Sequence, residues 1–261
     1  YAGLESVLLS TDWIPHAVAK VIEETWGCSV YNHYGTTEMG LGGGVDCRAL
    51  AGYHLREADL LFEIVDPDTG QPLPDGESGE VVFTTLTREA MPLIRYRTGD
   101  LGRFLPEPCA CGTVLRSMAH IDDRPAADLT LPGGDVLCQR DLDEVLFPLE
   151  GLLDFRAALV RRQGSGRDRA TLVLWVKCVE SGPGGGSGRG GESSGAIPVL
   201  DRDEILRALR EVTALSSPVV RERISIDIRD WGAGPETVLG AGKRKIEQME
   251  EGCDLAAEKA R

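Results

Sequence analysis

The pattern of hydrophobic and polar positions divides the chain into two parts with different elements. In the first part, apolar residues recur at helical spacing from Pro15 to Trp26, with Pro15 suited to a first turn and Gly27 to a stop. Two runs rich in β-branched and apolar residues follow, at 60–65 and 80–86, with turn-forming residues between them. The pattern predicts a helix and then an antiparallel hairpin with a long connection.

The second part has another order of elements. Its pattern predicts a helix, two strands, a helix and a strand, at residues 139–149, 155–161, 171–178, 201–215 and 224–228. In the later helix, Asp201 and Glu204 have the spacing of a capping box. The apolar stripe that this helix would bury consists of Ile205, Leu206, Leu209 and Val212. This order of elements predicts a small α+β layer.

We expect two domains, residues 1–121 and residues 129–261, with a hinge at 122–128. A Gly-rich stretch at 181–195 interrupts the second domain. Its composition cannot bury a core, so we predict a flexible insert without a catalytic role.

Composition and charge narrow the range of functions. The 261 residues include 42% hydrophobic residues, enough for one large or two modest cores. A formal net charge of −14 argues against a nucleic-acid partner, because such binding relies on clustered Lys and Arg. No apolar run is long enough to cross a membrane, and the first residues do not resemble a signal peptide. Seven scattered cysteines are more typical of reduced thiols or metal ligands than of disulfides, and we expect a cytoplasmic protein.

The most informative stretch is Tyr34-Gly35-Thr36-Thr37-Glu38, which follows a predicted strand. An aromatic ring can stack on a base, hydroxyls can bind phosphate oxygens, and a carboxylate can hold Mg²⁺. The stretch taken by itself is equally typical of a turn that ends a strand. Downstream, Asp100 follows Gly99 after another predicted strand, and its carboxylate could accept two hydrogen bonds from ribose hydroxyls.

Together these motifs resemble the adenylate-forming superfamily, and in particular its phenylacetate-coenzyme A ligase branch. Further similarities to that branch lie at residues 66–70, 74–80, 82–90 and 92–100, and the resemblance extends over essentially the whole chain. It implies the carboxyl-terminal portion of such an enzyme, with an α/β and α+β fold. The expected architecture is the distal part of the large AMP-binding domain, containing β-hairpins, followed by a small ferredoxin-like α+β domain.

The resemblance also implies roles for individual residues. The implied ligands are ATP or AMP, Mg²⁺ and coenzyme A. Lys243, in the run Gly240-Ala-Gly-Lys-Arg, is the expected catalytic lysine, although by itself such a run is also typical of a solvated basic loop. The nucleotide-binding residues would be Tyr34 at the adenine, Gly35 beside it, Thr36 and the catalytic Thr37 near the α-phosphate, the catalytic Glu38 at Mg²⁺, Asp100 on the ribose, and Arg124 at the hinge.

Four residues are candidates for a structural zinc site: Cys47, His54, Cys109 and Cys111. Cys109-Ala-Cys111-Gly is shaped like a tight thiolate knuckle, and four such donors suit tetrahedral Zn²⁺. Some members of the branch carry such a zinc. Ordinary buried thiols and a polar surface histidine are the alternative interpretation.

Several features differ from the family pattern. The Ser/Thr/Gly-rich loop that holds the triphosphate has no counterpart in these residues, so we expect an upstream portion or a companion polypeptide to supply it. Ser10-Thr11-Asp12 replaces the usual Gly, small residue and Glu. Pro125 restricts the backbone beside Arg124, which puts domain rotation for thioester formation in doubt.

Three functional hypotheses remain from the sequence. The first is an ATP-dependent ligase that joins an aryl-acetate-like carboxylic acid to coenzyme A through an acyl-adenylate. The second keeps adenylation but transfers the acyl group to a different acceptor, and the unusual hinge favours it. The third is a noncatalytic nucleotide- or zinc-binding module. The expected partners are the acid and coenzyme A, with a homodimer as a further alternative, and no nucleic acid or membrane.

Overall fold

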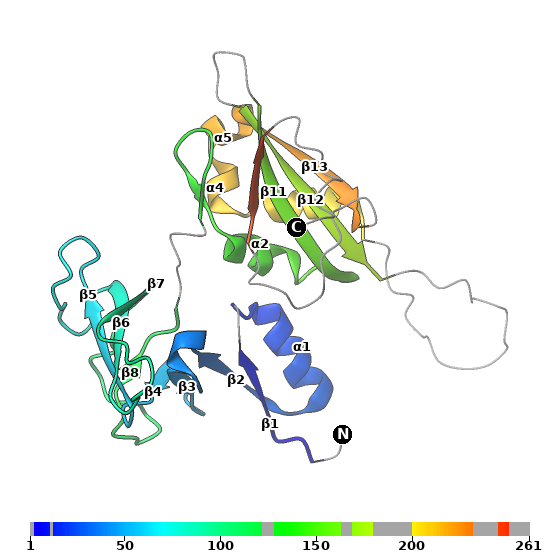
Figure 1. Ribbon diagram of the computed structural model, residues 1–261. Helices are drawn as coiled ribbons and strands as arrows, with labels where there is room; N and C mark the ends of the chain where they lie inside the picture. The colour runs from blue at the N-terminus through cyan, green and yellow to red at the C-terminus, as the bar shows by residue number, and fades with distance from the viewer. Residues whose placement is uncertain are drawn as a thin grey trace, which may run out of the picture. The chain divides into compact units, whose positions relative to one another are not determined.

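The computed structural model describes residues 3–10, 13–121, 128–162, 169–179, 200–231 and 245–250 (Figure 1). The chain divides into two compact units, residues 1–14 with 19–126 and residues 15–18 with 127–261. Of the hinge predicted at 122–128 only Asp128 is described, and the insert predicted at 181–195 lies outside the described residues. None of the described helices is long and apolar enough to cross a bilayer.

The first unit contains a mixed five-stranded sheet. The strands of this sheet are β1 (Ser6–Ser10), β2 (Ser29–Tyr34), β3 (Gly44–Asp46), β4 (Tyr53–Leu55) and β8 (Ser117–Met118). Between β1 and β2 the chain forms α1 (His16–Trp26), of which residues 19–26 belong to the first unit. The strand order is β1-β2-β3-β4-β8; β1 and β2 are parallel and the other pairs antiparallel. The helix predicted up to Trp26 is thus confirmed, and it connects the two parallel strands in sequence.

A second sheet in this unit is antiparallel and contains the predicted hairpin. Its strands are β5 (Leu60–Val65), β6 (Gly79–Thr85) and β7 (Tyr96–Gly102), in that order. The apolar runs predicted to pair do so, with Leu60 opposite Thr85 and Val65 opposite Glu80. Side chains from both sheets form the core of the unit, which contains Tyr34, Met39, Tyr53, Leu55, Leu60, Phe62, Ile64, Val81, Phe83, Phe104 and Met118.

Phe83 lies at the centre of this core, and we predict that Phe83→Ala lowers the free energy of unfolding by about 3–5 kcal/mol. Its side chain is fully buried, and its ring lies against Phe62 and Tyr96. The matched control is Leu61→Ala on β5, because Leu61 is 51% exposed. Urea denaturation of both variants measures the difference, and equal losses would contradict the assigned core.

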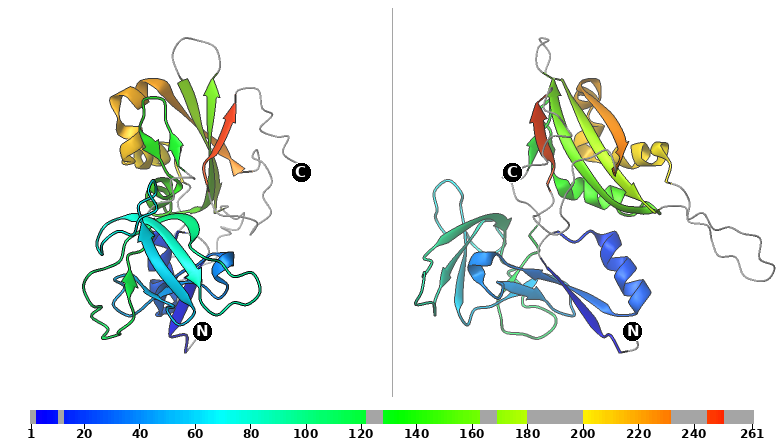
Figure 2. Two further views of the ribbon diagram at one scale, coloured as in Figure 1. Left: turned by 60° about the vertical axis from the view of Figure 1, so that its left-hand side comes forward. Right: turned by 45° about the vertical axis from the view of Figure 1, so that its right-hand side comes forward.

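The second unit is an α+β layer built on a four-stranded sheet. Its elements are β9 (Leu129–Thr130), β10 (Val136–Leu137), α2 (Gln139–Leu146), β11 (Leu152–Arg162), β12 (Arg169–Cys178), α3 (Arg202–Leu209), α4 (Thr213–Ser216), α5 (Pro218–Arg223), β13 (Ile224–Asp230) and β14 (Glu247–Glu250). The sheet order is β13-β12-β11-β14, and the helices lie on one face of it (Figure 2). Alternate residues of β12, such as Leu172 and Leu174, join the helices in the larger core, whereas Val173 and Trp175 face the opposite side. The predicted α+β layer is confirmed.

The single helix predicted over 201–215 is wrong in its length. Asp201 caps α3, with its carboxylate accepting a hydrogen bond from the backbone of Asp203, and the predicted stripe is buried at Ile205 and Leu209. The helix ends at Leu209, and Val212 then has an extended backbone before α4. Backbone hydrogen bonds between residues i and i+3 tighten the turn between α3 and α4. The chain changes direction there, but the spacing of apolar residues continues, so the sequence pattern did not indicate the break.

Candidate nucleotide and metal sites

Tyr34 is the last residue of β2, and the two residues after it lead into a short 3-10 helix, η1 (Thr37–Met39). Glycines keep this loop close to the strand end. A Cβ at Gly35 would lie 2.7 Å from the Cα of Gly42, and a Cβ at Gly42 would lie 1.8 Å from Nε2 of His33. Gly42 also has a φ of 96°, which side chains disfavour. The glycines at 35 and 42 therefore allow the backbone of this loop to pass close to the end of β2, where a larger residue would clash.

The structure brings Tyr34 and Asp100 together although 66 residues separate them. The Tyr34 hydroxyl donates to Oδ2 of Asp100 at 3.0 Å, and both side chains are buried. A buried carboxylate is costly unless hydrogen bonds compensate it. The pair therefore connects the end of β2 to β7, as expected if both residues serve one ligand.

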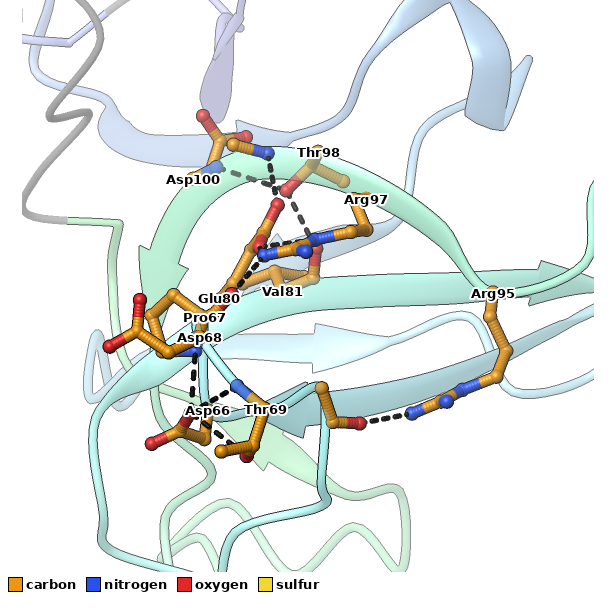
Figure 3. A network of polar contacts seen from close by, with 12 residues as sticks. Asp66, Pro67, Asp68, Thr69, Glu80, Val81, Arg95, Arg97, Thr98 and Asp100 are labelled. Carbon is orange, nitrogen blue, oxygen red and sulfur yellow. Dashed lines mark hydrogen bonds and ion pairs between the residues drawn. The ribbon is translucent and has the colours of Figure 1, made fainter.

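Asp100 lies in an irregular part of β7, shown in Figure 3. Val82 pairs with Arg97 and Glu80 with Leu101, so β7 contains two extra residues between these pairs. Gly99, at the centre of this bulge, has a φ of 75°. Asp100 follows Gly99 directly and its side chain is fully buried, so the path of the bulge sets where the carboxylate lies.

The hydroxyl of Thr36 is buried and lacks a hydrogen-bond partner within the described part of the chain. The residue precedes η1, and its carbonyl accepts a hydrogen bond from the backbone of Met39 at 3.0 Å. A buried hydroxyl without a partner costs about 1–3 kcal/mol. A phosphate oxygen bound at this point would remove that cost.

Two arginines fix the end of η1, and sequence reasoning missed both. Arg88 donates to the carbonyl of Glu38, and Arg56 donates to the carbonyl of Met39 at 2.9 Å.

The carboxylate of Glu38 lies beside Tyr96. Burial raises the pKa of this phenol, and the charge and hydrogen bond of Glu38 raise it further. These contacts join segments distant in sequence, so no local motif indicated them.

The ring of Tyr53 packs against Tyr34, with centroids 5.6 Å apart. Tyr53 also contacts His120 edge-on, and Nε2 of His120 lies 2.6 Å from Asp46. The second oxygen of Asp46 accepts from the backbone of Asn32 at 2.9 Å. This packing fixes the orientation of the Tyr34 ring.

The four predicted metal ligands also converge. The ligand atoms of Cys47, His54, Cys109 and Cys111 all lie within 4.8 Å of one another. The sulfurs of Cys47 and Cys109 are 3.6 Å apart, and Cys111 Sγ lies 3.4 Å from His54 Nε2. Tetrahedral Zn²⁺, with bonds of about 2.1–2.3 Å, separates its ligand atoms by roughly 3.5–3.8 Å. The donor set and its spacing therefore fit Zn²⁺, and the sulfur separation is too long for a disulfide.

Neighbouring groups orient His54 and shift the pKa values of two of the cysteines in opposite directions. Ser117, opposite His54 in the β4–β8 pair, lies with its hydroxyl 3.1 Å from Nδ1, so that Nε2 faces the cysteines. A hydrogen bond from the Thr113 backbone lowers the pKa of Cys111, and the charge of Arg48 also contributes. The backbone of Cys111 lowers the pKa of Cys109, but burial and the neighbouring thiols outweigh it and the net direction is upward.

The remaining predicted residues, Arg124 and Lys243, lie outside the described residues. Thr37 and Glu38 lie in η1 directly after Thr36. The structure thus brings Asp100 to the end of β2, which leads into η1, and separately gathers the four metal ligands.

Comparisons with known proteins show which family the chain resembles in sequence. Residues 1–86 match the family described as AMP-binding enzyme. A phenylacetate-coenzyme A ligase of Thermus thermophilus is 38% identical over 177 residues, covering 67% of this chain and 39% of that protein. The ligase of the same name from Escherichia coli is 39% identical over 150 residues, or 57% of this chain and 33% of that protein. The chain therefore spans about two fifths of the length of the Thermus relative.

Solved structures show the same fold. A 2-hydroxyisobutyryl-CoA ligase in the postadenylation state, in complex with R3-HIB-AMP, superposes with a TM-score of 0.64 at 20% identity over 95% of this chain and 49% of that one. ATP-bound MatB from Rhodopseudomonas palustris superposes with a TM-score of 0.52 at 15% identity, over 93% of this chain and 44% of that one.

Proposed function

Because this chain belongs to the phenylacetate-coenzyme A ligase branch of the adenylate-forming enzymes, we propose that it carries part of the active site of an ATP-dependent acid–coenzyme A ligase. The carboxylate of the acid attacks the α-phosphate of ATP, and pyrophosphate leaves. The thiol of coenzyme A then attacks the acyl-adenylate, a thioester forms and AMP leaves. The acid is of the aryl-acetate kind, as the names of the relatives suggest.

The observation that carries this proposal is the buried hydrogen bond between Tyr34 and Asp100. Thr36, two residues after Tyr34, adds a buried hydroxyl that has no hydrogen-bond partner among the described residues. We assign the ring of Tyr34 to the adenine and the Asp100 carboxylate to the ribose hydroxyls. An ionised carboxylate only accepts hydrogen bonds, which is the chemistry that ribose hydroxyls require. Thr36 and Thr37 would donate to the α-phosphate.

Glu38 would hold Mg²⁺, which spreads phosphate charge when it is bound. The arginine contacts at the end of η1 support this role, because they fix the backbone from which Glu38 extends. The Gly35 loop brings that backbone close to the nucleotide.

Cys47, His54, Cys109 and Cys111 would hold a structural Zn²⁺. All four positions of a tetrahedral site would be filled by protein groups, so no position remains for a substrate. Its contribution would be to tie the residues after β3 to the loop that precedes β8.

The assignments to Arg124 and Lys243 rest on the resemblance. We also propose that residues 122–128 form a hinge between domains at 1–121 and 129–261. The triphosphate loop and most of the acid pocket would come from further polypeptide, since the chain spans 39% of the Thermus relative. The exposed faces of β1 and α1 are suited to such packing, with a second copy of the chain as the alternative occupant.

Pyrophosphate exchange tests the function in protein purified from its source with any chain that accompanies it. We expect ATP–pyrophosphate exchange that depends on an aryl acid, followed by consumption of coenzyme A. Lys243→Ala should lower the exchange rate by about a hundredfold, because a cation opposite the developing charge is worth a few kcal/mol. The neighbouring Lys245→Ala is the control.

The outcomes separate the three hypotheses. Exchange without thioester formation would indicate a different acyl acceptor. No exchange with any acid would favour a noncatalytic module, and an unchanged rate in Lys243→Ala would remove the assignment of that lysine.

A further inference from the structure

We propose that Glu80 is a positioning residue for the nucleotide: it fixes the bulge of β7 that presents Asp100 to the ribose. This inference rests on the proposed function, which assigns Asp100 but gives no role to Glu80. Figure 3 shows the contacts that carry it.

Glu80 uses both carboxylate oxygens on the bulge. Oε1 accepts a hydrogen bond from the backbone N–H of Gly99 at 3.1 Å. Oε2 accepts from Nε of Arg97 at 2.7 Å and also from its Nη2. The side chain is 91% buried in its strand, and charge-assisted hydrogen bonds of this kind are stronger than neutral ones. One buried carboxylate thus holds the residues just before Asp100.

Arg97 connects this contact to the turn after β5. Its Nη2 also donates to the carbonyl of Pro67 at 2.7 Å. The turn itself is rigid, because Oδ1 of Asp66 accepts three hydrogen bonds from Asp68 and Thr69. Through Arg97, Glu80 is therefore also tied to the turn after β5.

A second contact fixes the bulge from within. The hydroxyl of Thr98 donates to the carbonyl of Val81 at 2.8 Å and accepts from the backbone N–H of Asp100 at 3.1 Å. Without Glu80 and Thr98, the extra residues of β7 would lose their hydrogen-bond partners on the neighbouring strand. A carboxylate that binds ribose must keep its orientation to within a fraction of an ångström, so loosening the bulge should weaken nucleotide binding.

The same sheet supplies a matched control. Arg95, two residues before Arg97, pairs with Glu63 at 3.1 Å and donates to the carbonyl of Gly70 at 2.9 Å. This pair joins the same sheet and the same turn, but no contact of Glu63 reaches the bulge in the part of the chain that the structure describes. Glu63→Ala therefore removes a similar cross-strand ion pair without the proposed positioning effect.

The test is AMP binding to the 261-residue chain by calorimetry. Glu80→Ala should raise the dissociation constant about tenfold, while Glu63→Ala should change it less than twofold. Glu80→Gln should recover most of the affinity, because its amide oxygen can still accept from Gly99. Thr98→Val keeps the shape of the side chain and should also weaken AMP binding. It replaces Glu80→Ala in the test if that variant does not fold. Amide exchange at Gly99 and Asp100 should be faster in Glu80→Ala than in Glu63→Ala.

Two results would overturn the inference in different ways. Full AMP affinity in folded Glu80→Ala or Thr98→Val, with Asp100→Ala impaired, would refute the positioning role alone. If neither the wild-type chain nor the protein purified with any chain that accompanies it binds AMP, the proposed function and the ribose role of the bulge are both refuted.

Discussion

Replacing Asp100 with alanine is expected to weaken AMP binding about a thousandfold. In the proposed function its carboxylate accepts two hydrogen bonds from the ribose, and hydrogen bonds to a charged group contribute about 1.5–3 kcal/mol each. Because each 1.4 kcal/mol corresponds to about a factor of ten, the loss of both amounts to roughly three orders of magnitude. Calorimetric titration of the 261-residue chain with AMP measures this change.

Tyr34→Phe is the control for this experiment. It removes the hydroxyl that donates to Asp100 at 3.0 Å but keeps the ring that packs on Tyr53. If the ring stacks on adenine and the carboxylate binds ribose, this variant should lose about tenfold in affinity or less. Equal losses in both variants would mean that the buried hydrogen bond, and not a ribose contact, accounts for the effect of Asp100.

Asp100→Ala should also destabilise the first unit, because it leaves the buried Tyr34 hydroxyl without this acceptor. We expect a loss of about 1–3 kcal/mol in the free energy of unfolding. Binding is therefore measured at a temperature at which both variants are folded by circular dichroism. A variant with this stability loss and unchanged AMP affinity would remove Asp100 from the nucleotide site.

Helices and strands whose apolar residues recur with a clear period could be predicted from the sequence. The sequences of β5 and β6 are rich in apolar and β-branched residues and lie between strong turn residues. Because the two strands are neighbours along the chain, their pairing could be predicted as well. The helix over 201–215 was predicted as one piece because its stripe stays apolar through Val212. Only backbone geometry shows that the chain turns after Leu209, since a tight turn can leave the spacing of buried residues unchanged.

The candidate sites were predictable where side-chain chemistry is distinctive. Metal binding is one of the few roles that thiols and an imidazole share, so Cys109 and His54 could be grouped as candidate ligands before any geometry was known. The supporting contacts could not be grouped in this way. Ser117 reaches His54 because of strand register, and Arg88 reaches Glu38 across 50 residues. Arginine and serine have many ordinary surface roles, so their sequence positions gave no signal.

Purified protein is expected to contain about one zinc ion per chain, and Cys109→Ser should reduce the zinc content close to zero. Serine keeps the size of the side chain but replaces a thiolate, the ligand that Zn²⁺ favours, with a weakly coordinating hydroxyl. Loss of the ion would free the loop around Cys109 from the segment that holds Cys47 and His54. We expect the melting temperature of the first unit to fall by about 10 °C or more, since a change of several kcal/mol moves it by a few degrees per kcal/mol.

Cys178→Ser is the matched control, because Cys178 lies at the end of β12 and outside the ligand cluster. Its zinc content should equal that of the wild type. Elemental analysis and calorimetry of the two variants then separate metal loss from a general effect of replacing cysteine. A ratio of zinc to protein near zero in wild-type material, purified without chelators, would show that the four side chains are ordinary thiols and a histidine. Their close spacing would then have to come from the packing of the segments around β4 and β8 alone.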